Sequence, residues 1–512
     1  MAAVDLSRYL PPGVYTETIQ GPQLAVNPSM PTAVALFGVA IGYRTAVESL
    51  MINPDTDEET PAVNRTLGQQ GINTATLQVR NPNTGEVYVQ GTDYTIVHLD
   101  GTIGTNNATY TISRVINGGH IQPGQIVQVS YQYTDPSYFD PQMLYDYEDV
   151  QAYYGAPFNT TTGEIQSELT LGARFAMMNG ASELVCVAVK PTGPGSTAGM
   201  SDYEDALNKL RDQPRVAIVV PCTGQQPIHQ LVYQHVISQS ENRFERRAIV
   251  GMDGTVTPVP SAQRILNAQN LSSNRVALVS PASFKYYAPE LNNEIVLGGQ
   301  FMAASLAGMT VSMSFAQPLT HKRITGWSDI GEMLREGEKS LESQNGLMVV
   351  EKTRRQIVRV RHGVTTDPTD LISREWSVTG QQDALTYRIR DYLESAKLIG
   401  QPIYDYTLVN VKASVEAALQ SLLRDGLLVD YASLKVRQLK TNPDVIEVTF
   451  SWQPAFPLNY IVVRFGISLT SGEISLGDTA NMADFSSAGG IGTPAMMATG
   501  AFGGSSNTLQ AI

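Results

Sequence analysis

Leu10-Pro-Pro-Gly-Val-Tyr-Thr-Glu-Thr-Ile19 and Thr32-Ala-Val-Ala-Leu-Phe-Gly38 are the two stretches that first indicate how this chain folds. Five prolines between residues 11 and 31 exclude a helix there. The piece Val14–Ile19 is β-prone but has no partner nearby in the sequence, so its backbone groups must pair with a sheet edge elsewhere. If that edge lies on a neighbouring subunit, residues 1–31 are an extended arm that serves assembly.

The composition predicts a multidomain protein with a sizeable core. The chain has 512 residues, 42% of them hydrophobic, which allows more than one domain. Charged residues make up only 16%, against about 25% in typical soluble domains, which suggests that partners cover much of the surface. The net charge of −13 argues against direct nucleic-acid binding.

Two features bear on the compartment. Cys186 and Cys222 lie in or beside apolar runs, and we expect buried thiols made in a reducing compartment. Residues 1–10 contain no apolar core segment, so we expect no signal peptide. The uncharged stretch 295–320 carries two Gln, a Pro and several Ser, Thr and Gly, so it predicts a buried small-residue helix rather than a membrane span.

Residues 51–135 predict an inserted antiparallel β domain of sandwich or barrel type on the outer surface. Short alternating segments, such as Ile126–Tyr133, are separated by turn signals such as Asn81-Pro-Asn-Thr-Gly85 and Asp100-Gly101. Alternation with period two and frequent turns is typical of such domains.

Residues 32–50 and 136–320 predict an α/β core with a doubly covered parallel sheet. Continuous apolar strands alternate with helices, which favours a doubly wound-like arrangement. The expected strands are Leu184–Val189, Val216–Val220, Ala248–Val250 and Val276–Val279. The expected helices start at Asp140-Pro141 and span Glu164–Met178, Tyr203–Leu210 with a capping box Ser201/Glu204, 226–240 and 259–270.

Residues 321–458 predict an α+β domain, with helices near 329–343, 380–398 and 410–425. A hairpin joins Ser433–Gln438 to Val445–Trp452 around Thr441-Asn-Pro-Asp444. Residues 459–470 form a last arm strand, because apolar residues alternate through 461–469. Residues 471–512 are rich in Gly, Ser, Ala and Met, and are either a flexible tail or a segment that orders in an assembly.

A search for catalytic, cofactor and metal sites yields none. The chain has no Gly-Lys dipeptide for a phosphate loop and no Gly-x-Ser-x-Gly turn. The loop Gly193–Gly199 has the wrong spacing for a dinucleotide, so we interpret it as a plain βα connection. His229 and His235 lie about 120° apart on a helix, which does not suit a metal pair, and two cysteines alone cannot build a zinc site.

Charge is segregated along the chain. Residues 321–440 carry 18 basic and 16 acidic residues, a net of +2, so the remainder carries −15. The basic run Lys352–Arg361 holds five Lys and Arg and no acid, which favours contact with an acidic partner. The alternatives are a solvated strand face and salt bridges within the chain.

An ordered series of motifs resembles the sheath proteins of contractile bacteriophage tails and related injection systems. The series begins with Pro12-Gly-Val-Tyr15 and Pro31–Gly38. It continues with Gly172–Gly180 and Leu184–Val189, Val276–Pro281, the helix at 298–309, Ser343–Val350, Val358–Thr366, Asp383–Leu393 and Trp452–Tyr460.

The resemblance implies a structural subunit that forms stacked six-fold rings around a tail tube and contracts from a metastable extended state without nucleotide hydrolysis. It implies that both arms add strands to neighbouring subunits, around the hairpin. The arm residues are Val14, Tyr15, Thr16, Glu17, Thr18, Ile19, Ile461, Val463, Phe465, Ile467 and Leu469; the receiving residues are Val436, Ile446, Val448 and Phe450. The C-terminal domain lies innermost, so Arg354, Arg355, Arg359 and Arg361 are candidates to face the tube.

The same resemblance implies the partners and the location. The partners are further copies of the chain, the tube protein, the baseplate and the tail terminator, with no nucleic acid, no membrane insertion and no cofactor. The protein would be made in the host cytoplasm and reside in the virion tail. Three alternatives stay open: another structural protein of the tail, a sheath of a non-phage injection system, and an α/β enzyme with a polar cleft near 191–200 and 221–225.

Overall fold

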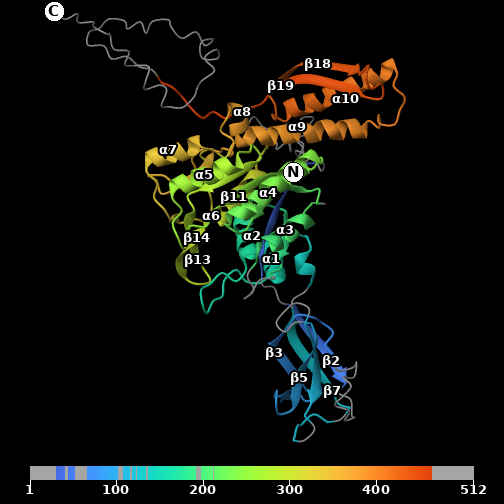
Figure 1. Ribbon diagram of the computed structural model, residues 1–512, viewed down its shortest axis with the longest axis vertical. Helices are drawn as coiled ribbons and strands as arrows, with labels where there is room; N and C mark the ends of the chain where they lie inside the picture. The colour runs from blue at the N-terminus through green and yellow to red at the C-terminus, as the bar shows by residue number, and fades with distance from the viewer. Residues whose placement is uncertain are drawn as a thin grey trace, which may run out of the picture.

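The fold has three parts, shown in Figure 1: an α/β core, an inserted β domain and a C-terminal unit of helices and a hairpin. This computed structural model describes residues 30–40, 44–51, 66–101, 108–115, 118–122, 124–133, 136–191, 198–211 and 213–463. The predicted arm strand 14–19, the positions Phe465, Ile467 and Leu469, and the tail 471–512 lie outside the described residues.

An eight-stranded sheet forms the centre of the α/β core. Its strand order is β17-β16-β12-β11-β10-β1-β9-β8, with parallel pairing from β16 through β9 and an antiparallel strand at each edge. The strands are β1 (Ala33–Val39), β8 (Gln142–Leu144), β9 (Leu184–Val189), β10 (Val216–Pro221), β11 (Arg247–Gly251), β12 (Val276–Ser280), β16 (Leu347–Lys352) and β17 (Val358–Val360). The prediction of a parallel sheet is confirmed.

Helices cover both faces of this sheet, as the continuous apolar strands predict. The inner strands send alternate side chains to two separate apolar clusters, for example Val34 and Leu36 to one and Ala35 and Phe37 to the other. The first cluster is covered by α1 (Tyr147–Tyr154), α2 (Glu168–Met178) and α6 (Gly299–Ser312), and the second by α3 (Met200–Lys209), α4 (Gln226–Glu241) and α5 (Ser261–Leu271).

The small-residue helix predicted at 298–309 is α6, and it is buried. A Cβ at Gly308 would lie 2.0 Å from the Ala176 carbonyl oxygen on α2, so only glycine allows the two helices to pack this closely. No helix in the described part of the chain is long and apolar enough to cross a membrane. Beside α6, an antiparallel sheet contains β13 (Ser283–Ala288), β14 (Asn293–Gly298) and β15 (Asp329–Ile330).

The inserted domain is antiparallel, as predicted. A four-stranded sheet, β2-β7-β3-β4, faces the β5–β6 pair, and both contribute to one apolar cluster. The strands are β2 (Arg44–Met51), β3 (Ile72–Arg80), β4 (Val87–Tyr88), β5 (Tyr94–Asp100), β6 (Thr109–Arg114) and β7 (Ile126–Tyr133). Because β2 pairs with β7 along its whole length, the domain begins near residue 44, and the expected boundary at residue 51 is too late.

The C-terminal unit consists of α8 (Leu371–Arg374), α9 (Trp376–Ser395), α10 (Asp405–Arg424), β18 (Asp430–Gln438) and β19 (Ile446–Gln453). It has its own apolar cluster. In Figure 1 it lies at the opposite end of the core from the inserted domain. The expected boundary at residue 320 is wrong for the sheet, because β16 pairs with β12 and extends the core sheet to Val360.

Several helix ends differ from the prediction because side chains cap elsewhere. α1 starts at Tyr147, where Asp146 accepts a bond from the Asp149 amide at 2.9 Å. The expected start at Asp140-Pro141 is wrong, since a short 3-10 helix (Pro136–Phe139) and the edge strand β8 occupy that region.

Other helices begin later or are capped differently. α2 begins at Glu168, after Ser167 accepts a bond from the Thr170 amide at 3.1 Å. In α3, the Gly199 amide donates to Asp202 at 2.8 Å, so the capping box predicted at Ser201 and Glu204 is wrong. The helix predicted near 329–343 is shorter, because β15 occupies its start and α7 spans Glu336–Gln344.

Candidate assembly interface

The β18–β19 hairpin is a two-stranded sheet with open edges. Tyr431, Leu434, Val448, Phe450 and Trp452 pack one of its faces against α9 and α10. Within the described part of the chain, neither outer edge pairs with a third strand. An isolated two-stranded ribbon has few backbone bonds, and its free amides and carbonyls are a template for further strands.

The hairpin forms where the sequence predicts it, around the turn at 441–444. The Leu439 amide donates to the Val445 carbonyl, and the Val445 amide donates to the Asn442 carbonyl, both at 3.0 Å. A bulge between Ala432 and Lys435 includes Ser433 with φ of 60°, which adds local twist to β18.

The four predicted receiving residues all lie on this hairpin. Val436 is directly opposite Val448, and Ile446 is opposite Gln438. Val448 and Phe450 pack against the helices, while Val436 and Ile446 are half-buried. Thus the structure brings the predicted receiving strand pair together, with its outward edges open.

The roots of both predicted arms lie on the C-terminal unit or its rim. Met30, the first described residue, packs against the same apolar cluster as the hairpin. At the other end, residues 454–463 leave β19 without regular structure, and Ile461 and Val463 are 76% and 75% exposed. In the single chain these two residues therefore form no strand, and the predicted arm strand stays a prediction.

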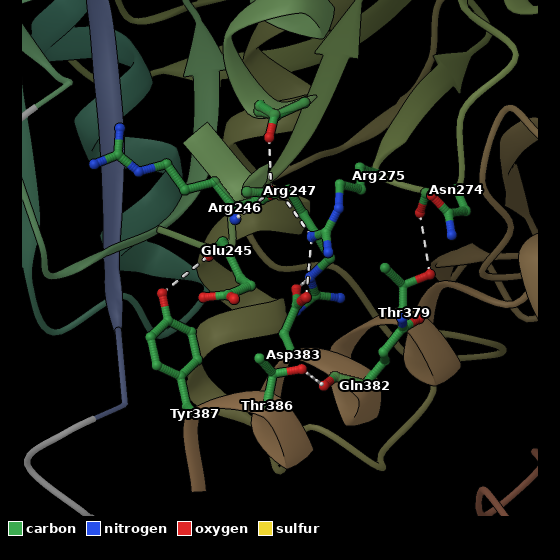
Figure 2. Close-up of polar contacts among 12 residues, drawn as sticks. Glu245, Arg246, Arg247, Asn274, Arg275, Thr379, Gln382, Asp383, Thr386 and Tyr387 are labelled. Carbon is green, nitrogen blue, oxygen red and sulfur yellow. Dashed lines mark hydrogen bonds and ion pairs between the residues drawn. The ribbon is translucent and has the colours of Figure 1, made fainter. Parts of the chain in front are cut away.

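Buried ion pairs attach α9 to the α/β core, as Figure 2 shows. Asp383 of α9 lies 3.0 Å from Arg275 and 3.7 Å from Arg247, and it is almost fully buried. Burial lowers the pKa of Arg247 to about 10, although Asp383 opposes this. Burial also raises the pKa of Asp383, and the two arginines oppose that shift.

Arg247 is held by more than one contact. Its guanidinium donates to the Trp376 carbonyl at 3.1 Å and lies 4.5 Å from the centre of the Trp376 ring. A Cβ at Gly380 would lie 2.9 Å from this guanidinium, so glycine provides the space for it on α9.

A second group of contacts fixes the next turns of α9. Arg390 pairs with Glu245 at 2.6 Å and donates to the Arg243 carbonyl at 2.9 Å. The Tyr387 hydroxyl donates to the Glu245 carbonyl at 3.4 Å (Figure 2). These contacts hold α9, and the hairpin packed on it, in a defined position on the core. The sequence pattern did not predict these contacts, and the Arg246-Arg247 pair at the start of a buried strand marked only their core side.

The predicted basic run divides into two kinds of residue. Arg354 and Arg355 are exposed in the turn between β16 and β17. Arg359 and Arg361 instead bind Glu351 at 2.9 and 3.1 Å, and Arg361 also binds Glu336 at 2.8 Å. Burial would raise the pKa of Glu351, but the hydrogen bonds from the two arginines hold it below its ordinary value. Salt bridges within the chain therefore engage two of the four candidates.

An α/β enzyme would bind substrate at the edge of the sheet where β10 ends. Cys222 and Thr223, just beyond that strand, are buried. Both cysteines are free, buried thiols, as expected, and burial raises their pKa values. Most of the loop at 191–200 lies outside the described residues.

The two histidines of α4, His229 and His235, contact different groups. His229 lies 3.4 Å from the Thr223 carbonyl, and His235 accepts from Arg246 at 3.0 Å. Among the described residues, no group of three or more His, Cys, Asp or Glu side chains is arranged to hold a metal ion.

Comparisons with known proteins agree with the sequence resemblance. No family model matches the chain. It is 47% identical to the "Tail sheath protein" of Mycobacterium phage Bxz1, over 92% of this chain and 98% of that protein. It is 25% identical to the "Tail sheath protein" of Staphylococcus phage Twort, over 42% of this chain and 36% of that protein.

Solved structures show the same fold at low identity. The helical sheath of the anti-feeding prophage in its contracted state matches with a TM-score of 0.52 and 13% identity, over 90% of this chain and 100% of that chain. A chain of the six-fold symmetrised baseplate of the anti-feeding prophage matches with a TM-score of 0.51, also at 13% identity and the same coverage. The extent and identity of the match to the Bxz1 protein confirm the predicted relationship, and the chain belongs to the family of phage tail sheath proteins.

Proposed function

We propose that this protein forms the sheath of a contractile phage tail, as stacked six-fold rings around the tail tube. Contraction from a metastable extended lattice would drive the tube through the host envelope without nucleotide hydrolysis. The observation that carries the proposal is the β18–β19 pair, a sheet with two open edges on the unit from which both arm roots leave. The contracted sheath of similar fold supports it.

The arms complete this sheet between subunits. Residues 14–19 and 461–469 of neighbouring copies add strands beside β18 and β19. Each added strand supplies about five backbone hydrogen bonds at about 1 kcal/mol each. One arm is a modest link, but each subunit gives and receives two, so the lattice gains from avidity.

The ion pairs of Asp383 and Arg390, which we call the α9 junction, join the C-terminal unit to the core so that the subunit moves as one rigid body. Asp383, Glu245 and Arg247 are buried, and the partners Arg275 and Arg390 are half-buried, so breaking these ion pairs costs more than bending an arm. Contraction then repacks rigid subunits while the arms stay paired, with Gly13, Gly21 and the neighbouring prolines as hinges. The contracted lattice buries more interface, which makes the switch downhill.

The two ends of the subunit face different partners. The C-terminal unit and the β16–β17 turn lie against the tube, where Arg354 and Arg355 are exposed and able to meet an acidic surface. The inserted domain lies on the outside. The baseplate triggers contraction and the tail terminator limits length. The protein assembles in the host cytoplasm and functions in the virion.

Negative-stain electron microscopy tests the proposal directly. The purified chain is imaged at several concentrations, alone and with tube protein. We expect long, regular hollow tubes, either from the chain alone or on the tube template. Dispersed monomers under both conditions would refute self-assembly as a sheath.

A further inference from the structure

The segment that leads from β19 to the C-terminal arm is held on the subunit as a strap. We define the strap as Pro454–Asn459. Pro454 is buried, and the strap then alternates: Ala455, Pro457 and Asn459 are half-buried, whereas Phe456 and Leu458 are exposed. From Tyr460 onward every described side chain is exposed. The contact with the subunit therefore ends sharply at Asn459.

A buried glutamine on α9 grips the backbone of the strap. The Gln381 side chain donates to the Ala455 carbonyl at 3.0 Å and accepts from the Ala455 amide at 2.7 Å. The side chain thus pairs with both backbone groups of one residue, as a neighbouring strand would. This satisfies the strap where no secondary structure does so.

A buried carboxylate grips the end of the strap. Glu375 is fully buried between α8 and α9. Its Oε1 accepts a hydrogen bond from the side-chain amide of Asn459, Nδ2, at 3.0 Å. The same oxygen lies 3.0 Å from His362 Nε2 and 3.5 Å from Arg374. The Trp376 amide donates to the Gly363 carbonyl at 3.1 Å, which fixes the backbone beside Glu375.

The prolines make the strap stiff between these two grips. Pro454 and Pro457 have a restricted φ and no amide hydrogen, so the segment favours an extended form and has few donors to satisfy. Fixing Ala455 and Asn459 therefore fixes the direction of the chain at Tyr460.

We infer that Gln381, Glu375 and Asn459 form a latch that sets the point at which the C-terminal arm leaves the subunit, and so which neighbour the arm reaches. This rests on the proposed function for the arm's role. The nine residues 461–469 span about 30 Å when extended. Releasing the six-residue strap adds about 20 Å of reach, enough to bring other subunits within range.

Hydrogen exchange on the full chain tests the latch itself. Gln381→Ala removes both bonds to Ala455, and Asn459→Ala removes the bond to Glu375. Gln382→Ala, on an exposed neighbour in α9, and Asn208→Ala, on an exposed face of α3, are matched controls. We expect exchange in the peptide 453–463 to rise at least tenfold in the two latch variants and to stay unchanged in the controls.

Unchanged exchange in both latch variants would overturn the latch. Asn459→Ala alters only a half-buried surface residue, so it remains informative if Gln381→Ala fails to fold. The second measurement is the lattice of assembled tubes. We expect the latch variants to form tubes of mixed diameter or broken helical order, with the controls like the wild type.

Increased exchange together with a wild-type lattice would show a structural contact that does not position the arm, and would overturn the inference. If the wild-type chain itself forms no tubes, the proposed function fails and the arm-positioning part of the inference falls with it. The exchange data still decide whether the strap is latched.

Discussion

Helix α9 and the β18–β19 hairpin belong to one C-terminal unit, but they differ in whether their polar groups have partners within the subunit. On α9, Asp383 is buried and Arg390 is half-buried, and both are paired with charged groups of the core. On the hairpin, charges such as Lys435 are exposed, and the outer backbone edges lack partners within the described part of the chain.

This difference separates what one chain completes from what it leaves to its neighbours. Buried charges must be compensated within the subunit, because an unpaired one would cost several kcal/mol. Open strand edges on the surface are solvated, so they cost little in the monomer and gain when another strand arrives. We therefore expect changes on α9 to alter stability, and changes to the hairpin's strand partners to alter assembly.

The largest effect is expected from removing residues 1–20. The deletion removes the whole predicted arm strand, Val14–Ile19, and with it one proposed partner of each hairpin. We expect a folded monomer with unchanged thermal stability and no tubes by negative-stain microscopy. Tubes of normal length from the deleted chain would show that assembly does not need the N-terminal arm to complete the hairpin sheet.

A point variant makes the same test more specific. Thr16→Pro removes one backbone donor within the predicted arm strand, whereas Gln23→Pro adds a proline to a spacer that already contains several. The first should impair tube formation and the second should not.

At the junction between α9 and the core, Asp383→Ala leaves Arg247 and Arg275 without their shared carboxylate. We expect a loss of about 3–5 kcal/mol in the free energy of unfolding, measured by urea denaturation. Asp205→Ala, on an exposed face of α3, is the matched control and should change stability by less than about 0.5 kcal/mol.

Acid should weaken the core next to this junction. Burial, reinforced by Arg246 and Arg211, lowers the pKa of His235 to about 3. The unfolded chain takes up this proton near pH 6.5 and the folded chain does not, so His235 reduces stability as pH falls from 6.5 towards 3. One proton contributes at most about 1.4 kcal/mol per pH unit.

His235→Gln keeps an acceptor for Arg246 without the titration. Its stability should fall less steeply between pH 6.5 and 4 than that of the wild type, as measured by urea denaturation across that range. Equal slopes would show that His235 does not titrate differently in the folded state.

The smallest effect is expected in the β16–β17 turn. Reversing the charges of Arg354 and Arg355 removes no ion pair within the described chain, so stability should change by less than about 0.5 kcal/mol. Tube-protein binding should weaken several-fold at low salt, since exposed pairs contribute about 0.2–1 kcal/mol each. Co-sedimentation with tube protein measures this, and unchanged binding would remove both residues from the tube interface.

The sequence predicted those strands and turns that are determined by a few neighbouring residues. The run Leu184–Val189 predicts a buried strand because every residue is apolar, and Thr441-Asn-Pro-Asp444 predicts the hairpin because a turn follows directly from it. The wrong boundary at residue 320 has a different cause. Nothing in Leu347–Lys352 says which sheet it joins, and that depends on β12, about seventy residues earlier.

The polar contacts that fix α9 were beyond reach for the same reason. Asp383 meets arginines more than a hundred residues away, and no spacing rule connects them. The basic run at 352–361 was visible, but only the structure shows that Glu336 and Glu351 engage Arg361 while Arg354 stays exposed. A charge pattern therefore found the region, and tertiary pairing decided which of its members were available.

In the proposed lattice, neighbouring subunits complete the β18–β19 sheet. A helical reconstruction of assembled tubes by cryo-electron microscopy tests it most directly. We expect two additional strands beside the hairpin, one from residues 14–19 of one neighbour and one from residues 461–469 of another. A well-ordered tube in which both outer edges of the hairpin remain without a strand would contradict it.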